Sequence, residues 1–356
     1  MGYGTPTPIQ DTVIPLVRQD KDVVGQAQTG TGKTAAFGIP IVERVDPLSK
    51  SLQALVLTPT RELAVQVTGE INRLGQYTGI RAVAIYGGQA FGPQLDALQR
   101  GTQVVVATPG RLMDHMGRGN LRLDQVCIVV LDEADQMLDI GFAPDIERIL
   151  RQTPRTRQTL LFSATMPEPI KRLANRYMRN PQWIRVGGEA KPVEQMEQVY
   201  YEVAERDKLR ALSELLEDPN GITQALIFRR TKVGVDDLVH DLQRRGYEAQ
   251  GIHGDMTQAQ RDAVMKLFRA NRLRLLVATN LAARGLDISG ISHVINYDMP
   301  STVEEYVHRI GRTARMGKPG TAVTFVSEWD IQMFEAVRRH IGDALRPQRL
   351  AKLYTQ

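Results

Sequence analysis

The sequence predicts an α/β protein built from two tandem units, each a mostly parallel sheet flanked by helices. Short apolar runs alternate with longer amphipathic stretches along all 356 residues, a pattern typical of repeated strand–helix–strand units. After Val186 a stretch with two glycines, charges and a proline interrupts this alternation, which then starts again. The length is sufficient for about two domains, each with its own core.

Six short apolar runs are the predicted strands of the first unit. They are Asp22–Gly25, Ala54–Thr58, Ala82–Tyr86, Val104–Thr108, Val126–Asp132 and Thr159–Ser163. Helices are predicted between them, for example over Arg61–Tyr77 and Phe91–Arg100. The run that ends at Asp132 is too short for a helix of this hydrophobicity and is typical of a strand buried on both faces.

The second unit repeats the pattern after the interruption. Its predicted strands are Gln198–Val203, Ala225–Phe228, Ala249–His253, Leu275–Ala278, Val294–Tyr297 and Ala322–Val326. Its predicted helices include Lys208–Leu216, Val233–Arg245 and Gln258–Arg269. We therefore expect one domain over residues 1–187, a linker over 188–193 and a second domain over 194–356. The basic segment Arg346–Gln356 is expected to begin an extension.

Composition narrows the class of protein. Hydrophobic residues make up 42% and charged residues 24% of the chain, as in ordinary globular proteins. The formal charge of +5 is compatible with a polyanionic partner but is weak support alone. The only cysteine, Cys127, excludes a disulfide framework and fits a small core residue in a reducing compartment. Without a signal peptide or an apolar run long enough to span a bilayer, we expect a cytoplasmic protein without membrane association.

The segment Ala27–Thr34, with sequence AQTGTGKT, has the pattern of a phosphate-binding loop between a strand and a helix. Gly30 and Gly32 let backbone N–H groups, including that of Thr31, turn towards phosphate oxygens at the positive end of a helix dipole. Lys33 would reach the β- and γ-phosphates, and the Thr34 hydroxyl would bind Mg²⁺. Ala27 replaces the usual first glycine, which a small residue tolerates.

Two adjacent carboxylates follow the buried run, at the edge where parallel sheets bind ligands. Asp132 is expected to hold Mg²⁺, partly through water, and Glu133 to orient and activate the attacking water. In the alternative interpretation Glu133 and Asp135 are ordinary acids at a helix N-terminus, but this leaves the upstream loop unexplained. The two elements together predict a nucleoside triphosphatase.

With these elements in place, nearly the whole chain resembles the core of the DEAD-box ATP-dependent RNA helicases, through motifs in the family's order. In the first half these are Gly2-Tyr3 with Pro6–Gln10, the phosphate loop, Pro59–Ala64, Gly87-Gly88, Thr108–Arg111, Asp132–Asp135 and Ser163–Thr165. In the second half they are His253–Asp255, Thr279 with Ala283–Asp287, and His308–Arg315. Each motif is weak alone, but the ordered set is specific. The resemblance implies two RecA-like domains.

The resemblance also implies roles around ATP. Gln10 can read the adenine edge with its donor and acceptor, Tyr3 is expected to stack on the base, and Asp287 to bind the ribose. Arg312 and Arg315 are implied to be arginine fingers for the γ-phosphate; their spacing places them on one face if the segment is helical. Four residues are implied to couple hydrolysis to unwinding. They are Asp135, Ser163, Thr165 and His308.

RNA contacts are implied for residues that can bind phosphate or 2′-OH oxygens, or permit close backbone approach. In the first half they are Thr60, Arg61, Gly88, Thr108, Gly110 and Arg111. In the second half they are Gly254, Gln258, Arg261 and Thr279. Each residue taken alone is equally well explained as a helix cap or tight turn. Backbone contacts carry no sequence information, so little sequence preference is expected.

Three departures from the family pattern bear on these expectations. Asn280 stands where the family has aspartate, and Ala314 where it has glycine. Arg229 and Arg230 stand where it is more often neutral, which we interpret as added attraction for RNA.

The expected activity is RNA-stimulated hydrolysis of ATP with Mg²⁺, coupled to domain closure, local unwinding of short RNA duplexes and remodelling of RNA–protein complexes. We expect the core to be monomeric; protein partners are unknown. Two alternatives stay open: a DNA-directed helicase of the same architecture, and an ATP-gated RNA clamp with slow hydrolysis. A comparison of how strongly RNA and DNA stimulate ATP hydrolysis distinguishes the first alternative from the expected activity.

Overall fold

The computed structural model describes residues 4–27, 30–186, 196–218, 221–283, 291–313 and 320–350. The chain divides into two units, Met1–Glu189 and Ala190–Gln356, and each is described by itself. The expected linker, residues 188–193, lies outside the described residues. None of the helices in the described part of the chain combines the length and the apolar composition needed to cross a bilayer.

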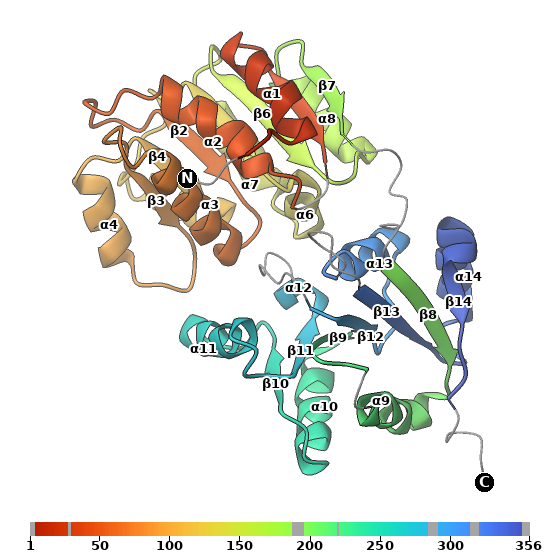
Figure 1. Ribbon diagram of the computed structural model, residues 1–356. Coiled ribbons are helices and arrows are strands. Elements are labelled where there is room, and N and C mark those ends of the chain that lie inside the picture. The colour runs from red at the N-terminus through yellow and green to blue at the C-terminus, as the bar shows by residue number, and fades with distance from the viewer. Residues whose placement is uncertain are drawn as a thin grey trace. The chain divides into compact units, whose positions relative to one another are not determined.

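Unit 1, drawn in red to yellow-green in Figure 1, contains a seven-stranded sheet. All neighbouring strands are parallel, in the order β3-β4-β2-β5-β6-β1-β7. The strands are β1 (Val23–Gln26), β2 (Ala54–Leu57), β3 (Ala82–Ile85), β4 (Val104–Ala107), β5 (Ile128–Leu131), β6 (Gln158–Ser163) and β7 (Gln182–Arg185). The helices are α1 (Pro8–Arg18), α2 (Lys33–Arg44), α3 (Arg61–Leu74), α4 (Phe91–Gln99), α5 (Pro109–Gly117), α6 (Ala134–Asp139), α7 (Ala143–Gln152) and α8 (Glu168–Tyr177).

Alternating side chains of the central strands build two cores, one on each face of this sheet. On β2, Val56 packs with Val67 of α3 and Phe37 of α2, whereas the next residue, Leu57, packs with Leu112 of α5. Successive strand residues point to opposite faces, so helices α1 to α3 cover one face and α5 to α8 the other. Burial on both faces explains why these strands read as continuous apolar runs.

Unit 2 has its own seven-stranded parallel sheet, in the order β10-β11-β9-β12-β13-β8-β14. The strands are β8 (Met196–Glu202), β9 (Ala225–Arg229), β10 (Ala249–Ile252), β11 (Leu275–Thr279), β12 (His293–Asn296), β13 (Gly320–Val326) and β14 (Leu345–Pro347). The helices are α9 (Lys208–Glu217), α10 (Lys232–Arg244), α11 (Gln258–Arg269), α12 (Asn280–Ala283), α13 (Val303–Ile310) and α14 (Ile331–Ile341).

The two sheets have the same topology. If the strands of each unit are counted along the chain, both sheets follow the order third, fourth, second, fifth, sixth, first, seventh. The α/β class, the tandem arrangement and the twelve predicted strands are confirmed, with ends that differ by one or two residues. The seventh strand of each sheet, β7 and β14, was not predicted from the sequence. β14 includes Arg346 and Pro347, so the expected extension does not begin at Arg346.

Candidate functional site

The strand order of unit 1 sorts the candidate residues into two groups along one edge of the sheet. In a parallel sheet the carboxyl ends of all strands meet at the same edge. The strands β5, β6 and β1 are neighbours, and after them come the acid pair, Ser163–Thr165 and the phosphate loop. The strands β3, β4 and β2 form the adjoining part, and the predicted RNA contacts follow them. The sheet therefore places predicted nucleotide and RNA residues in adjacent halves.

The described part of the phosphate loop has the backbone shape that its glycines permit. Gly30 has φ +83° and Gly32 φ +90°, a left-handed conformation that costs a residue with a side chain about 1–2 kcal/mol. Gly32 precedes α2, and Lys33, its first residue, is buried. The Lys33 Nζ donates a hydrogen bond to the Ala27 carbonyl at 3.1 Å, so the ammonium lies inside the loop. Gln28 and Thr29 lie outside the described residues.

Gln10 connects α1 to this loop. Its Nε2 donates to the Gly32 carbonyl at 3.1 Å, and its Oε1 accepts from the Thr7 backbone N–H at 3.0 Å. A Cβ on Gly32 would lie 2.5 Å from the Gln10 Nε2, which gives a second reason for glycine. A primary amide has two N–H donors and two acceptor lone pairs, so one of each remains for a base. Tyr3, the expected stacking partner, lies outside the described residues.

The acid pair emerges from β5 in a strained turn. The Asp132 N–H donates to the Leu57 carbonyl at 2.9 Å, which keeps the chain in register with β2. Glu133 then has φ +51° and ψ +51°, and it is buried. The other described residues with positive φ, apart from glycines, are Asp20, Asn180 and Asn271, whose short polar side chains tolerate this conformation. Backbone strain of this kind clusters at functional sites, so the conformation agrees with the predicted role of Glu133.

Electrostatics at Asp132 favour a cation. Burial raises the pKa of its carboxyl group, the nearby Lys33 charge and the Glu133 N–H lower it, and Asp135 raises it further. Its Oδ1 accepts from the Glu133 N–H at 3.0 Å. The Asp132 carboxylate and the Thr34 hydroxyl are hard oxygen ligands, as Mg²⁺ prefers. Mg²⁺ is usually bound through one or two carboxylates together with waters and substrate phosphates. These residues therefore fit Mg²⁺.

Asp135 joins the acid turn to the loop after β6. Its Oδ2 accepts from both the backbone N–H of Thr165, at 2.9 Å, and the Thr165 hydroxyl, at 2.8 Å. The Ser163 hydroxyl instead accepts from the Asp135 backbone N–H at 3.2 Å. Of the two hydroxyls, only that of Thr165 therefore binds the Asp135 carboxylate. The geometry is a direct link between β5 and β6, and the coupling role stays a prediction.

Two predicted RNA-binding arginines converge on the loop Tyr86–Ala90. A Cβ on Gly88 would lie 2.2 Å from Nη1 of Arg61, so the Arg61 guanidinium covers this glycine, whose φ is +77°. The Arg111 Nη2 donates to the Gln89 carbonyl at 2.9 Å. Arginines from α3 and α5 thus meet at one loop of β3.

The threonines and the second glycine of the RNA group behave differently. The Thr60 Oγ1 accepts from the Leu63 N–H at 3.3 Å, so Thr60 is a helix cap. Thr108 is buried at the start of α5 and makes no side-chain cap. No atom lies within 4 Å of a Cβ placed on Gly110, so close approach of a ligand to its backbone is unobstructed there.

In unit 2 the arginine-finger segment is not a continuous helix. α13 ends at Ile310 and Gly311 is its C-cap; Arg312 follows in a turn, its N–H bonded to the Arg309 carbonyl at 3.2 Å. The expectation that Arg312 shares a helical face with the next finger is therefore not supported by α13. Arg312 is buried, and His308 lies half-buried in the last turn of α13. Arg315, Asp287 and Ala314 lie outside the described residues.

A buried ionic network beside Arg312 was missed in the sequence. The Arg309 Nη1 donates to the Asn296 Oδ1 at 3.2 Å and to the Asp298 carbonyl at 2.8 Å. Asp298 also binds Arg229, whose Nη1 lies 2.9 Å from its Oδ1. Arg229 is therefore held within the protein, which corrects its assignment to RNA attraction; only Arg230 is exposed. The sequence gave no sign of which of the two adjacent arginines, Arg229 or Arg230, would be internal.

The predicted RNA residues of unit 2 follow β10 and β11, the strands that correspond to β3 and β4. Arg261 of α11 donates through Nη2 to the Ala282 carbonyl at 3.2 Å, and the Thr279 hydroxyl accepts from the Ala282 N–H at 3.4 Å. Gln258 binds Asp262 at 2.9 Å. Gly254 is exposed, with no atom within 4 Å of a Cβ placed on it. Asn280 is the first residue of α12.

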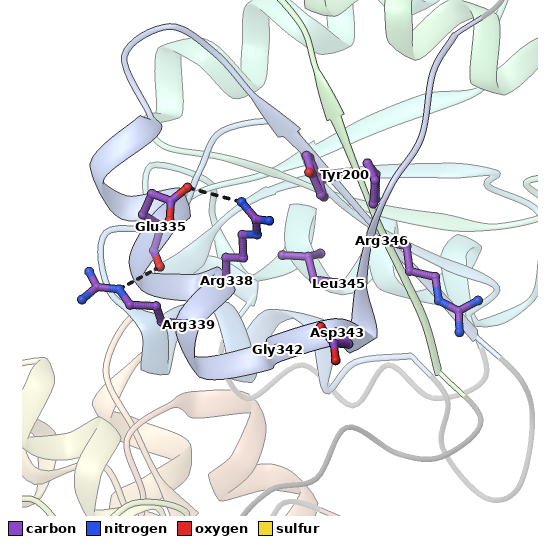
Figure 2. Close-up of a pocket in the computed structure, with 9 residues that line it drawn as sticks. Tyr200, Glu335, Arg338, Arg339, Gly342, Asp343, Leu345 and Arg346 are labelled. Carbon is purple, nitrogen blue, oxygen red and sulfur yellow. Dashed lines mark hydrogen bonds and ion pairs between the residues drawn. The ribbon is translucent and has the colours of Figure 1, made fainter.

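A separate cavity of about 430 Å³ lies between α14 and β14, away from these residues. Figure 2 shows that its arginines do not converge: Arg338 and Arg339 bind Glu335, while Arg346 points elsewhere. The lining also includes the carboxylate of Asp343. This cavity is not part of the candidate site.

A phosphate loop, a buried acid pair and a second unit of the same topology with a buried arginine define the class of two-domain nucleoside triphosphatases. Comparisons with known proteins narrow this class. Residues 7–173 match the DEAD/DEAH box helicase family and residues 207–317 match the helicase conserved C-terminal domain. The chain therefore belongs to the DEAD-box family of ATP-dependent RNA helicases.

Named relatives and solved structures agree with this assignment. The DEAD-box ATP-dependent RNA helicases CshA of Bacillus licheniformis and Bacillus subtilis are 52% and 51% identical over 339 residues, which is 95% of this chain and 69% and 68% of theirs. Dbp5 of S. cerevisiae bound to RNA and ADP BeF3 has a TM-score of 0.88 and 33% identity, covering 99% of this chain and 92% of that one. A DEAD box protein from Methanococcus jannaschii has a TM-score of 0.56 and 41% identity, covering 98% and 94%. The fold of two tandem RecA-like domains is confirmed.

Proposed function

We propose that this chain couples RNA-stimulated hydrolysis of ATP to closure of its two domains, and that closure locally unwinds short RNA duplexes and remodels RNA–protein complexes. The observation that supports this most is the strand order. In unit 1 the predicted RNA residues follow the second, third and fourth strands of the sheet. In unit 2 they follow the third and fourth strands. In unit 1 the nucleotide residues follow the neighbouring first, fifth and sixth strands. One rigid sheet can therefore transmit a change at one ligand to the other.

In the proposed reaction, Lys33 and the loop N–H groups hold the β- and γ-phosphates. Glu133 orients the attacking water and accepts its proton. Arg312, with Arg315, supplies fixed positive charge to the γ-phosphate in the transition state. Asp132 and Thr34 would hold Mg²⁺, which when bound neutralises charge on the phosphates.

RNA and ATP are proposed to bind cooperatively, because each orders a surface that the other needs. Arg61 and Arg111 bind the phosphate backbone without reading bases. Domain closure around both ligands bends one RNA strand, which a duplex does not accommodate, so the partner strand is released. Release of phosphate reopens the protein. The Asp135–Thr165 link is the proposed route from the acid turn to this movement.

The domain limits at residues 187 and 194, the monomeric state and the cytoplasmic location remain predictions from the sequence. Nothing in the proposed reaction depends on them.

The test is ATP turnover with no nucleic acid, with single-stranded RNA, and with DNA of equal length and sequence. We expect RNA to stimulate turnover and DNA to stimulate it far less, since 2′-OH contacts distinguish the two. Turnover that does not respond to RNA contradicts the proposed coupling. Equal stimulation by DNA would favour the DNA-directed alternative.

Glu133→Gln in the same assay separates binding from chemistry. We expect ATP binding to persist and turnover to fall by about 10²–10⁴, the usual contribution of a general base. Glu168→Gln, which changes an acid at the start of α8, is the matched control and should keep full activity. Normal turnover in Glu133→Gln would remove Glu133 from its role.

A further inference from the structure

An aromatic ring lies among the predicted RNA-binding arginines of unit 1. Phe91 is the first residue of α4, directly after the loop that carries Gly88. The guanidinium carbon of Arg111 lies 4.2 Å from the centre of its ring, and that of Arg118 lies 4.1 Å from it. A guanidinium at this distance is attracted by the negative face of the ring. One side chain therefore contacts two cations from α5 and its C-cap.

Arg111 is held in one position by these contacts. Its side chain is only 9% exposed, its Nη2 donates to the Gln89 carbonyl at 2.9 Å, and its Nε lies 3.8 Å from Asp114. Its Nη1 is buried and has no hydrogen-bond partner. A buried donor without a partner costs about 1–3 kcal/mol, so the contacts with the ring and with the Gln89 carbonyl hold Arg111 in place although one of its N–H groups is left unsatisfied.

A second layer supports the ring. His115 is fully buried with its ring centre 4.7 Å from that of Phe91, and its Nε2 lies 3.2 Å from the Gln94 Oε1. The Gln94 Nε2 in turn donates to the Tyr86 carbonyl at 3.0 Å. This chain of contacts ties α5, α4 and the end of β3 together around Phe91.

We propose that Phe91 is a positioning residue for RNA binding, which holds Arg111 for a backbone phosphate and places Arg118 beside it. The inference rests on the proposed phosphate contact of Arg111. Two guanidiniums on one ring concentrate positive charge beside the loop after β3, where the predicted RNA residues of unit 1 lie. Such a concentration of positive charge attracts a polyanion. Phe91 itself touches neither nucleotide nor reacting atoms.

The test uses the full chain with Phe91→Leu, Phe91→Tyr, Arg111→Ala and the double variant Phe91→Leu/Arg111→Ala. The affinity for single-stranded RNA is measured directly, and the RNA concentration for half-maximal ATPase stimulation is measured separately from turnover at saturating RNA. Thermal unfolding checks that each variant is folded. Leucine keeps an apolar side chain but removes the ring face, and tyrosine keeps the ring.

We expect Phe91→Leu to weaken RNA binding about two- to fivefold, the size of one cation–π contact. Turnover at saturating RNA and without RNA should not change, and Phe91→Tyr should bind RNA like the unchanged protein. In the double variant, loss of Phe91 should cost less than it does in the unchanged protein, because only its contact with Arg118 is left to lose. Arg118→Ala should weaken binding, whereas Arg176→Ala, which removes an exposed arginine stacked on Tyr177, should not.

Three results overturn the inference: additive losses in the double variant, a tyrosine variant as weak as the leucine variant, or unchanged or tighter RNA binding by Phe91→Leu while Arg111→Ala is impaired. If Arg111→Ala binds RNA normally, the phosphate contact of Arg111 itself is wrong. The two failures are therefore distinguishable.

Discussion

Asp132 and Asp135 are three residues apart, yet their carboxylates are stabilised in different ways. Asp135 accepts hydrogen bonds from the Thr165 N–H, the Thr165 hydroxyl and the Gln136 N–H. Asp132 accepts one, from Glu133, and burial raises the pKa of its carboxyl group. The Asp135 carboxylate is therefore bound by its own neighbours. The Asp132 carboxylate has one hydrogen bond and is the one that we propose as a Mg²⁺ ligand.

Asp132→Asn should therefore stabilise the protein in the absence of Mg²⁺ while abolishing turnover. With a pKa raised above the unfolded value, the folded state keeps a proton at pH values where the unfolded state has lost it. Stability then falls as pH rises through this range and stays lowered at neutral pH. Asparagine removes the charge, and we expect a gain of about 1 kcal/mol in the free energy of unfolding at pH 7.5, as at other function-constrained sites.

Urea unfolding of both variants in Mg²⁺-free buffer checks this prediction. Asp135→Asn is the matched control, and it should lower the free energy of unfolding. Its amide cannot accept all three hydrogen bonds, and each lost bond costs about 1 kcal/mol. A less stable Asp132→Asn protein would show that its carboxylate is structural as well.

At this scale the sequence predicted the residues that carry a pattern and missed those that do not. Lys33 and Asp132 were recognisable because a phosphate loop and an acid pair have fixed spacing. Asp298 was not, because its ion-pair partner Arg229 is distant in sequence. The same reason explains the error on Arg229, which pairs across strands with Asp298.

At the scale of elements, the contact between α3 and the loop after β3 depends on one glycine. Gly88→Ala should displace the Arg61 guanidinium, since the new Cβ would lie 2.2 Å from its Nη1, and RNA affinity should fall about three- to tenfold as one phosphate contact is lost. The strained φ should also lower stability by about 1 kcal/mol. RNA binding and urea unfolding measure the two effects.

Gly79→Ala is a control that separates the loss of stability from the loss of RNA affinity. Gly79 has φ +81°, and a Cβ added to it would lie 3.7 Å from a Pro47 carbon, an ordinary contact distance. Alanine there has the same strain without touching an arginine. Its stability should fall equally and its RNA affinity should not change. If both variants bind RNA equally well, Arg61 is not a phosphate contact.

The packing of α5 contains a titratable group whose hydrogen bonds require a neutral ring. The His115 Nε2 faces the Gln94 Oε1, and its Nδ1 faces the Asn120 Nδ2, so Nε2 donates and Nδ1 accepts. Burial lowers the pKa of His115, as do the charges of Arg111 and Arg118, while Asp114 opposes them. Protonation would set an N–H of His115 against the N–H of Asn120.

Stability should therefore fall as pH drops below about 6.5, where the unfolded histidine binds a proton that the folded one rejects. Between pH 7.5 and 5.5 the unchanged protein should lose about 1 kcal/mol more than His115→Gln, measured by urea unfolding at both pH values. His340→Gln, at an exposed histidine of α14, should lose as much as the unchanged protein. An equal loss in His115→Gln would place the acid-sensitive group elsewhere.

Element prediction failed where a strand lacks an apolar run. β7 has mostly exposed side chains and β14 has three residues that include a proline. Both are edge strands held by parallel pairing to β1 and β8, a tertiary contact that local sequence does not encode. The other twelve strands, including the edge strands β3 and β10, were predictable because each is apolar or alternates.

At the scale of the molecule, two sheets of identical strand order carry different chemistry, because only unit 1 has a phosphate loop. Arg312 follows α13 of unit 2 in a turn and is buried. If Arg312 completes the nucleotide site, Arg312→Ala should leave ATP binding by Lys33 intact. The variant should lose positive charge that stabilises the transition state, so turnover at saturating RNA should fall by about 10³ or more.

Two measurements on the full chain decide this. Nucleotide binding should stay within a fewfold of the unchanged protein while turnover falls, and turnover should no longer respond to RNA, because closure then assembles an incomplete site. Arg338→Ala removes an arginine of the same unit that pairs with Glu335 at the surface, and it should keep full RNA-stimulated turnover. An Arg312→Ala protein that unfolds at lower temperature but still hydrolyses ATP under RNA control would make this arginine a structural residue. The fixed positive charge that unit 2 is proposed to supply to the γ-phosphate would then have to come from Arg315 alone.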